Sequence, residues 1–288
     1  MFQETFQRYL NLIEQYLAQL LWDDDILNQS MYYSLSGGGK RIRPVLALAA
    51  AEVAGGNLPR ILPAAAALEL IHTYSLIHDD LPAMDNDDYR RGRLSNHKVF
   101  GEANAILAGD ALLTYAFELL ALPGLGDPER QLRVIQETAI AAGKSGMVGG
   151  QAADMAGEGQ ELTLSELQAI HKGKTGALLT VSARLGAILA GGSEQEVEAL
   201  TVYAQALGLA FQIKDDILDV VGDSETLGKP AGSDQRQGKV TYVTLLGLEG
   251  AERQLHEQTL KAQSALHVFD KKAVFLRDLA NYIEQRQH

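Results

Sequence analysis

Apolar residues recur at intervals of three and four along almost the whole chain of 288 residues, and this spacing is the feature that most restricts its fold. Val45, Leu46, Ala49, Ala50 and Val53 are one example. This period places side chains on one face of an α-helix, and the Ala and Leu that fill these segments favour helix. Alternating β-branched runs between turn residues, which would predict strands, are almost missing. We therefore expect an all-α fold.

Clusters of glycine and proline divide the helical segments and leave roughly nine to eleven helices of ordinary length. The predicted breaks are residues 36–39, 55–59, 82–92, 123–128, 157–160, 191–193 and 222–238. Because no Ser/Pro/Gly-rich linker and no fixed-period repeat occurs, we expect one domain over residues 1–288. The 222–238 stretch is long for a bundle connection, and loops of that size are usually functional lids or disordered. Helices that are apolar nearly all round predict a deep centre or a face buried against a second subunit.

The charge balance excludes several classes of partner. The net charge of −12 repels nucleic acid and anionic membrane surfaces, so any anionic ligand must be held by local charge. The chain has no cysteine, which excludes disulfides, thiolate metal sites and a thiol nucleophile and is compatible with a reducing cytoplasm. Residues 1–20 predict an amphipathic helix and not a signal peptide. Because the chain contains no run of 18 apolar residues, we expect no membrane span.

The first acidic cluster lies in HDDLPAMDNDDYRRG, residues 78–92. Pro82 cannot donate to the carbonyl of His78, so the preceding helix is expected to stop near Asp80. Asp79 and Asp80 then lie at a helix C-terminus, where the dipole disfavours anions by roughly 0.3–1 kcal/mol each. Local conflicts of this kind are expected where function overrides folding. The proline break also allows the chain to bring Asp85 back towards Asp79.

The second acidic cluster is FQIKDDILDV, residues 211–220. Asp215 and Asp219 are four residues apart on a predicted helix and share one face, with Gln212 one turn earlier. Like charges at that spacing are destabilising unless a cation lies between them. The alternative is that each cluster is a solvated helix end, but two clusters that both follow strongly apolar helices favour a site. A ligand set made only of carboxylate oxygens suits Mg²⁺ bridged to a diphosphate.

Two basic segments, SGGGKRIRP and YRRGR, oppose the acids. Glycines 37–39 allow close backbone approach, and arginine forks match phosphate oxygens. The first segment is not a P-loop, because Ser34 stands where its first glycine belongs and Arg41 replaces the Mg²⁺-binding Ser or Thr. The six cations of the two segments predict a second diphosphate site: Lys40, Arg41, Arg43, Arg90, Arg91 and Arg93.

Further polar residues stand at suggestive places. Lys174 and Thr175 lie in HKGKTGAL at a predicted helix kink or start, and Lys229 and Lys239 lie in or beside the long glycine-rich loop. Each lysine taken singly is more often a surface residue than a ligand. His72 precedes Asp79 by seven residues and shares its helical face, although a lone histidine in an apolar helix is usually a core residue.

Taken together, DDLPAMD with RRG, DDILD and GGGKRIRP resemble the two aspartate-rich motifs and the basic loop of short-chain trans-prenyl diphosphate synthases. The resemblance covers nearly the whole chain in the family's order. It implies an all-α, single-domain bundle of the isoprenoid synthase type around a deep apolar pocket, usually a homodimer. It also implies condensation of isopentenyl diphosphate with the allylic dimethylallyl and geranyl diphosphates, with three Mg²⁺ ions per site, Mn²⁺ being an alternative.

The resemblance implies roles residue by residue. The metal ligands would be Asp79, Asp80, Asp85, Asp215, Asp216 and Asp219, with the first and last aspartates of the first motif and Asp215 foremost. The allylic diphosphate would contact Arg90, Lys174, Lys229 and Lys239. Isopentenyl diphosphate would contact Lys40, Arg43, His72 and Arg91. Thr175 and Gln212 would lie beside the developing carbocation.

Product length is expected to depend on Tyr74, five residues before Asp79, with Ser75 beside it. The resemblance implies that an aromatic ring at this position stops the chain at C15. We therefore expect a farnesyl diphosphate synthase, with a geranylgeranyl diphosphate synthase as the alternative.

Three other functional classes are compatible with parts of the sequence. The dipeptide His78-Asp79 also occurs in HD-type phosphohydrolases, but that class leaves DDILD and the basic segments unexplained. A terpene cyclase binds one diphosphate and has little use for Lys40, Arg43 and Arg91. A non-catalytic metal- or diphosphate-binding bundle would bind ligand without turnover, although DNDDYRRG lacks the glycine and final glutamate of an EF-hand.

Overall fold

The computed structural model describes residues 2–20, 22–222 and 239–287, and within these ranges the chain is almost entirely helical, as predicted. The only sheet in these ranges is a hairpin of two antiparallel strands, each two residues long. The elements are α1(Phe2–Gln19), α2(Ile26–Leu35), α3(Ile42–Val53), α4(Leu58–Asp79), β1(Tyr89–Arg90), β2(Arg93–Leu94), α5(Asn96–Phe100), α6(Glu102–Leu120), α7(Pro128–Ala142), α8(Met147–Gly157), α9(Leu164–His171), the π-helix η1(Lys172–Gly176), α10(Ala177–Ala190), α11(Glu194–Val221), α14(Tyr242–Ala265), the 3₁₀-helix η2(Leu266–Ala273) and α15(Val274–Gln285).

Each predicted break within the described ranges coincides with a helix boundary to within two residues, and the break at 82–92 also contains the short strand β1, but the predicted number of helices was too low. The described ranges contain thirteen α-helices. Four breaks were not recognised: the connection between α1 and α2, Gly101, residues 143–146, and the 3₁₀-helix η2 between α14 and α15. Gly101 has a φ of 83°, a left-handed conformation that glycine adopts without the steric penalty of a side chain, and it separates α5 from α6.

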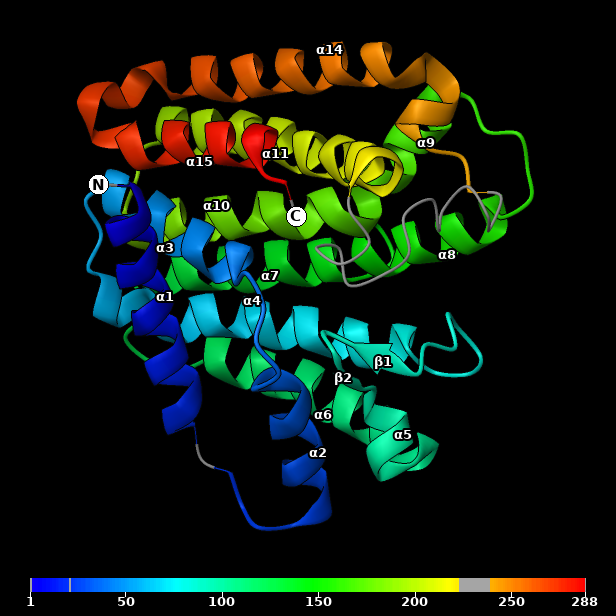
Figure 1. Cartoon of the computed structure of the whole chain (residues 1–288). Coiled ribbons are helices and arrows are strands. Elements are labelled where there is room, and N and C mark those ends of the chain that lie inside the picture. The colour runs from blue at the N-terminus through cyan, green and yellow to red at the C-terminus, as the bar shows by residue number, and fades with distance from the viewer. Residues whose placement is uncertain (1, 21, 223–238, 288) are drawn as a thin grey trace.

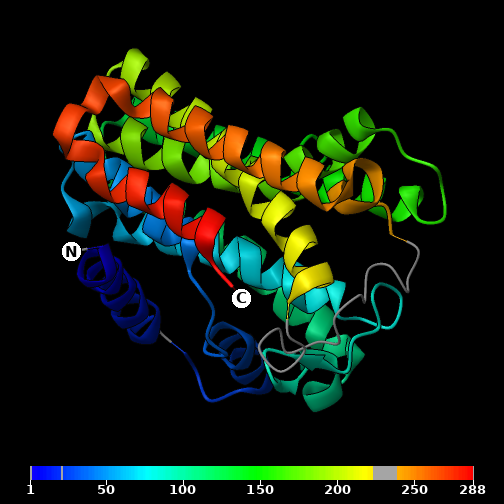
Figure 2. The ribbon, with the colours of Figure 1, turned by 45° about the horizontal axis from the view of Figure 1, so that its top comes forward.

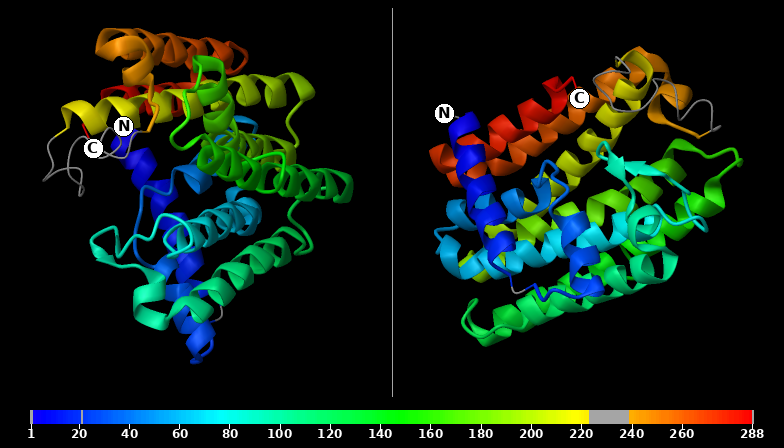
Figure 3. Two further views of the ribbon diagram at one scale, coloured as in Figure 1. Left: turned by 90° about the vertical axis from the view of Figure 1, so that its right-hand side faces the viewer. Right: turned by 60° about the horizontal axis from the view of Figure 1, so that its bottom comes forward.

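Long helices lie side by side and form a stack (Figure 1). The helix α14 packs on α11, α11 on α10, α10 on α3, and α4 on both α3 and α6. Figure 2 shows α15 running beside α11 and α14, and Arg286, which follows α15, contacts Phe211 of α11. The hairpin and α5 lie at the end of the stack where α4 ends (Figure 3). The ends of α4 and α11 carry the two acidic clusters, so the fold brings both clusters to one end of the bundle.

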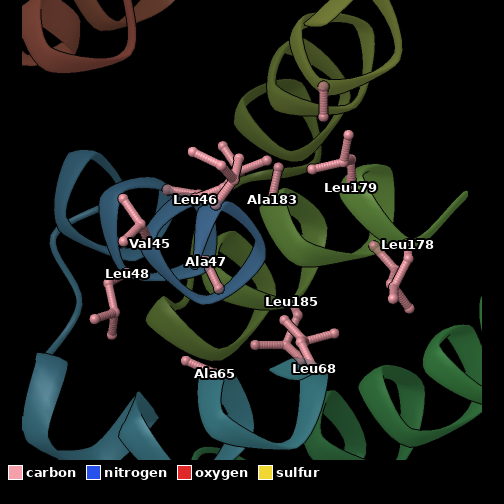
Figure 4. Packing of buried hydrophobic residues seen from close by; sticks show 14 of the residues in the cluster. Val45, Leu46, Ala47, Leu48, Ala65, Leu68, Leu178, Leu179, Ala183 and Leu185 are labelled. Atoms are coloured by element: carbon pink, nitrogen blue, oxygen red, sulfur yellow. The ribbon is translucent and has the colours of Figure 1, made fainter. Parts of the chain in front are cut away.

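The centre of the stack is made by α3 and α10, which are buried on nearly all sides. A Cβ added at Gly186 of α10 would collide with the carbonyl oxygen of Ala47 in α3, so the two backbones approach more closely than any other residue would permit. Figure 4 shows Ala47, Leu185 and Leu68 packed where α3, α10 and α4 meet. The all-round apolar sequence of these helices is therefore explained by a deep centre.

The N-terminal segment is an amphipathic helix, as predicted, and α1 buries Tyr9, Ile13 and Leu17. The ring of Phe2 in this helix packs against Phe275 and Tyr282 of α15, with ring centroids 5.3 and 5.5 Å apart. Offset aromatic pairs of this kind stabilise by about 0.5–1.5 kcal/mol each beyond their buried area. The two ends of the chain are thus packed together.

Two helices of the described part of the chain, α4 and α6, are long and apolar enough to cross a membrane by length and composition alone. In the α4 window, 67% of the residues are buried inside the protein, as is usual for a core helix of a globular protein. The corresponding fraction in α6 is 39%, because one face of this helix lies on the surface.

Candidate active site

The first acidic cluster begins where α4 ends, at Asp79, as Pro82 predicted. The turn that follows folds back on the helix, and the N–H of Asp85 donates to the Asp79 carbonyl at 2.9 Å. Asn86 assists this reversal with a left-handed φ of 54°. Asp85 therefore returns to the helix end that carries Asp79, as the proline break allowed.

Asp80, in contrast, points to an arginine. Its carboxylate accepts hydrogen bonds from the Nε of Arg90 at 2.7 and 2.9 Å, and the Arg90 Nη2 lies 2.6 Å from the same group. The Asp80 side chain is 3% exposed. A buried carboxylate gripped by an arginine fork holds that arginine in a fixed orientation. Among the six predicted metal ligands, Asp80 is thus placed to orient Arg90, which lies in β1.

Asp79 lies in an environment that opposes its negative charge. Burial raises the pKa of Asp79 to about 6, and the nearby carboxylate of Asp85 acts in the same direction, whereas Lys174 and Arg90 oppose the shift. An acid with a raised pKa is less stable in its ionised form than it would be in water. A divalent cation held between Asp79 and Asp85 would reverse this effect, because opposite charge favours ionisation.

The second acidic cluster divides between two functions. Asp215 lines the main cavity, which is described below, and accepts a hydrogen bond from the guanidinium of Arg286. Asp216 is buried and accepts a hydrogen bond at 2.7 Å from the backbone N–H of Tyr242, at the first turn of α14. Asp219 is buried one turn further along α11. Of the three, Asp215 lies at the cavity and Asp216 supports a helix N-terminus.

A cavity of 660 Å³ lies between the two acidic helix ends, with Asp79 on one wall and Asp215 on the other. The apolar side chains of α8 form much of the remaining lining, including Met147, Val148 and Met155. Eleven of the predicted site residues line this cavity: Arg43, His72, Tyr74, Ser75, Asp79, Arg90, Arg91, Lys174, Thr175, Gln212 and Asp215. Residues from four separate parts of the sequence therefore converge on one space.

The two basic segments meet at the mouth of a second cavity, of 380 Å³, which includes Lys40. The Arg91 guanidinium donates a hydrogen bond to the carbonyl of Gly38. A Cβ at Gly39, where φ is 135°, would lie 2.7 Å from the Arg91 Cζ, so a side chain there would displace the guanidinium. Arg91 and Gly92 form the two-residue turn of the hairpin, both with positive φ. Gly39 is thus explained as the position that leaves room for the Arg91 guanidinium.

Arg43, His72 and Arg91 line both cavities, so the two spaces are continuous. Burial lowers the pKa of Arg43 to about 10, so it remains a cation at neutral pH. Burial and the charges of Arg43 and Arg91 lower the pKa of His72 well below its usual value. A neutral imidazole among guanidinium groups can donate one hydrogen bond to an anion without adding positive charge.

Arg41 and Arg93, the remaining cations of the two segments, have other partners. Arg41 is buried, and its guanidinium donates to Glu69 of α4 and Glu14 of α1 at 2.7 Å each. Arg93 stacks on the ring of Tyr33 at 4.1 Å. Arg41 is the residue directly before α3, so its buried ion pairs fix the start of this helix. Lys40 precedes Arg41 in the chain, and Arg43 follows it in the first turn of α3.

Lys174 and Thr175 lie in the π-helix η1, so the predicted kink or start is confirmed. π-helical turns within longer helices are frequent at functional sites. Lys239 lies with Lys174, Gln212 and Asp216 around a third cavity of 140 Å³. Lys229 and the predicted lid at residues 222–238 lie outside the described residues, apart from Gly222.

Tyr74 is 6% exposed, and its ring contacts the imidazole of His78 edge-on, with centroids 5.7 Å apart. Burial raises the pKa of its hydroxyl to about 12. His78 lines the same cavity and directs Nε2 to the carbonyl of Ile106 in α6, at 3.1 Å. The two rings therefore form one wall of the cavity where α4 meets α6. Because His78 is directed to Ile106, it is not placed to bind a metal ion together with Asp79, as a phosphohydrolase of the HD type would require.

Several residues at the site were not found from the sequence. Asp154 pairs with Lys174, Gln151 and Phe211 line the main cavity, and Arg286 stacks on Phe211 at 4.2 Å. Asp154 is the second of two polar residues that follow the glycines of GGQAAD, but no local pattern connects it with Lys174, which lies twenty residues later. Arg286 carries no signal of its own beyond its charge.

The donor set fits a hard divalent cation if the ligand supplies further oxygens. No group of three or more His, Asp or Glu side chains within residues 2–20, 22–222 and 239–287 is arranged to hold an ion by itself. Mg²⁺ usually keeps waters and joins one or two carboxylates to substrate phosphates. The carboxylates of Asp79, Asp85 and Asp215 match that mode of binding.

Comparison with known proteins identifies relatives over most of the chain. A family model described as polyprenyl synthetase matches residues 24–275. A farnesyl diphosphate synthase of Geobacillus stearothermophilus is 51% identical over 268 residues, which cover 91% of this chain and 89% of the relative. A geranylgeranyl diphosphate synthase of Cyanophora paradoxa is 49% identical over 261 residues, 90% of this chain and 87% of the relative. The crystal structure of a geranylgeranyl pyrophosphate synthetase from Pyrococcus horikoshii superimposes with a TM-score of 0.90 at 33% identity, covering 99% of both chains.

Proposed function

Because the chain belongs to the polyprenyl synthetase family, we propose that it condenses isopentenyl diphosphate with dimethylallyl and geranyl diphosphate to give farnesyl diphosphate and pyrophosphate. The observation that carries this proposal is the cavity of 660 Å³, which has an acidic residue on each of two walls and opens into a cationic pocket. Two diphosphates fit this arrangement. One would be held by the carboxylates through a metal ion, and the other would be held by the cationic side chains.

The allylic diphosphate binds between the two acidic walls. Asp79 and Asp85 on one side and Asp215 on the other would hold Mg²⁺, with Asp216 and Asp219 behind Asp215. When bound, Mg²⁺ supplies electrostatic stabilisation to the leaving diphosphate as the allylic C–O bond ionises. Arg90, which Asp80 orients, and Lys174 add fixed positive charge on the same diphosphate. Lys239 joins them from the third cavity.

Isopentenyl diphosphate binds in the cationic pocket, where Lys40, Arg43 and Arg91 surround the neutral His72. The pocket is continuous with the main cavity, so the double bond of isopentenyl diphosphate can reach the allylic carbon. Thr175 lines both spaces and Gln212 lines the main cavity, and both offer polar oxygens to the developing carbocation. The rest of the lining is largely apolar, which keeps water away from a cation that water would trap.

Tyr74 supports farnesyl over geranylgeranyl diphosphate as the product. Its ring and that of His78 close the cavity along α4, and Ser75 lies beside them at the same wall. A growing prenyl tail meets this wall after the second condensation. The geranylgeranyl synthases among the relatives keep C20 as the second candidate.

We also propose a homodimer in a reducing cytoplasm. Support for the dimer comes from apolar side chains exposed along α6 and α7, among them Leu107, Leu132 and Ile140 at 55%, 67% and 55% exposure. A surface helix that exposes such residues commonly lies against another protein chain. The absence of cysteine supports the compartment. Light scattering during size-exclusion chromatography measures the mass directly.

The proposed activity is tested with radiolabelled isopentenyl diphosphate, dimethylallyl diphosphate and Mg²⁺, followed by chromatography of the dephosphorylated alcohols. A C15 alcohol that requires Mg²⁺ is expected. A C20 alcohol as the main product would favour the second candidate. Release of phosphate without carbon–carbon bond formation, or Mg²⁺-dependent binding without turnover, would overturn the proposal.

A further inference from the structure

One carboxylate near the allylic site has no part in the roles given above. Asp154, on α8, accepts a hydrogen bond from the Nζ of Lys174 at 2.6 Å, and both side chains are 31% exposed. The two residues line the third cavity together with Gln212 and Lys239. A lysine ammonium has three donors, so the bond to Asp154 leaves two for a diphosphate. Asp154 is therefore one side chain away from the proposed allylic diphosphate.

The backbones that carry this pair are locked together by glycine. A Cβ at Gly150 would collide with the backbone nitrogen of Lys174, and a Cβ at Gly173 would lie 3.1 Å from the Gly150 Cα. Gly150 and Asp154 are four residues apart on one face of α8. That face lies directly against η1. The position of Asp154 relative to Lys174 is thus set by backbone contact and not by two flexible side chains meeting at a surface.

Lys174 has a second carboxylate within electrostatic reach. Lys174 and Asp79 both line the main cavity, so the ammonium lies on the same space as the first acidic wall. A lysine on a flexible four-carbon chain can pair with either acid. If it paired with Asp79, it would compete with a metal for that carboxylate. The neighbouring His171 offers no competing charge to Asp154, because burial lowers the pKa of this histidine to about 4.

We propose that Asp154 is a positioning residue for the allylic substrate: it holds the Lys174 ammonium at the diphosphate site and away from Asp79. This inference rests on the proposed prenyl transfer and extends it to a residue that touches neither substrate nor metal. Loss of the Asp154 charge releases Lys174, which weakens binding of the allylic diphosphate and leaves the isopentenyl diphosphate pocket unchanged.

The test is steady-state kinetics of Asp154→Asn and Asp154→Glu, with Glu161→Gln, an exposed loop residue, as the control for a lost negative charge. For Asp154→Asn, we expect the KM for dimethylallyl diphosphate to rise by about tenfold or more, and that for isopentenyl diphosphate by less than about twofold. Asp154→Glu keeps the charge and recovers part of the loss. Glu161→Gln matches the wild type.

A double-mutant cycle separates positioning from general packing. Binding of dimethylallyl thiolodiphosphate with Mg²⁺ is measured by calorimetry for Asp154→Asn, Lys174→Gln and the double variant. If Asp154 acts through Lys174, the double variant binds no more weakly than Lys174→Gln. Additive losses, equal increases in both KM values, or Asp154→Asn kinetics equal to the wild type would overturn the inference. A wild-type enzyme without prenyl transfer would instead overturn the proposed function, which keeps the two failures distinct.

Discussion

Replacing Asp79 by Asn is expected to stabilise the metal-free protein while it removes activity. Burial and Asp85 raise the pKa of Asp79 from 3.8 to about 6, a net effect that already includes the opposing charge of Lys174. A difference of this size corresponds to about 3 kcal/mol by which the folded state disfavours the ionised carboxylate. The amide of Asn is neutral at every pH and avoids that penalty.

The sign of the pH dependence follows from proton binding. Between pH 3.8 and about 6 the folded protein binds the Asp79 proton more tightly than the unfolded chain does, so the wild type loses stability as the pH rises through this window. Above about pH 6, Asp79 is ionised in both the folded and the unfolded state, and the full destabilisation by its buried charge is present. Asp79→Asn is therefore expected to gain up to about 3 kcal/mol at pH 8 and only about 1.5 kcal/mol at pH 5.

The assay is urea unfolding in EDTA at pH 5, 6 and 8, followed by circular dichroism. The exposed Asp23→Asn serves as the control, since it removes one charge away from the site. Added Mg²⁺ and pyrophosphate are expected to stabilise the wild type more than Asp79→Asn, while kcat of the variant falls by roughly 10²-fold or more. A variant that is less stable than the wild type in EDTA at pH 8, or a gain in stability that does not change with pH, would refute the reasoning.

Three other substitutions test separate parts of the structure. Tyr74→Ala removes the aromatic wall and is expected to lengthen the main product from C15 towards C20, measured by chromatography; an unchanged C15 product would contradict the role given to the ring. Glu69→Gln leaves its arginine partner buried with one hydrogen-bonded charge lost and is expected to cost about 3 kcal/mol or more in the free energy of unfolding; a loss below about 1 kcal/mol would show that the pair is solvated. Gly39→Ala displaces the guanidinium of Arg91 and is expected to raise the KM for isopentenyl diphosphate by about tenfold, whereas Gly38→Ala, whose added Cβ meets open space, isolates the backbone strain alone. Equal effects of the two glycine substitutions would contradict the displacement.

The helices and the acidic ends could be predicted from the sequence because their causes are local. Periodic apolar residues fix the faces of a helix, and Pro82 fixes the end of α4 at Asp79 without reference to any other part of the chain. The same holds for the kink at Lys174 and Thr175, because Gly173 precedes this polar pair and Gly176 follows it. The helix count was too low because single glycines such as Gly101 are tolerated within helices as well as between them.

The partners of the charged residues could not be predicted, because they come from distant segments. Nothing local distinguishes Asp80, which orients Arg90, from Asp79, which faces the cavity. Arg41 and Arg43 stand two residues apart, yet one is buried against glutamates and the other lines the cationic pocket. Tertiary packing decides which face of each segment is turned inward, and only the folded backbone contains that information.

The central claim is that carboxylates on two opposing helix ends hold one diphosphate through metal ions. The most direct test is a crystal structure of the protein with dimethylallyl thiolodiphosphate and Mg²⁺. Electron density for Mg²⁺ that joins Asp79 and Asp85 to the diphosphate, and for a further ion at Asp215, is the predicted result. A diphosphate bound elsewhere, or bound between the helix ends with no metal on Asp79 or Asp215, would contradict the claim.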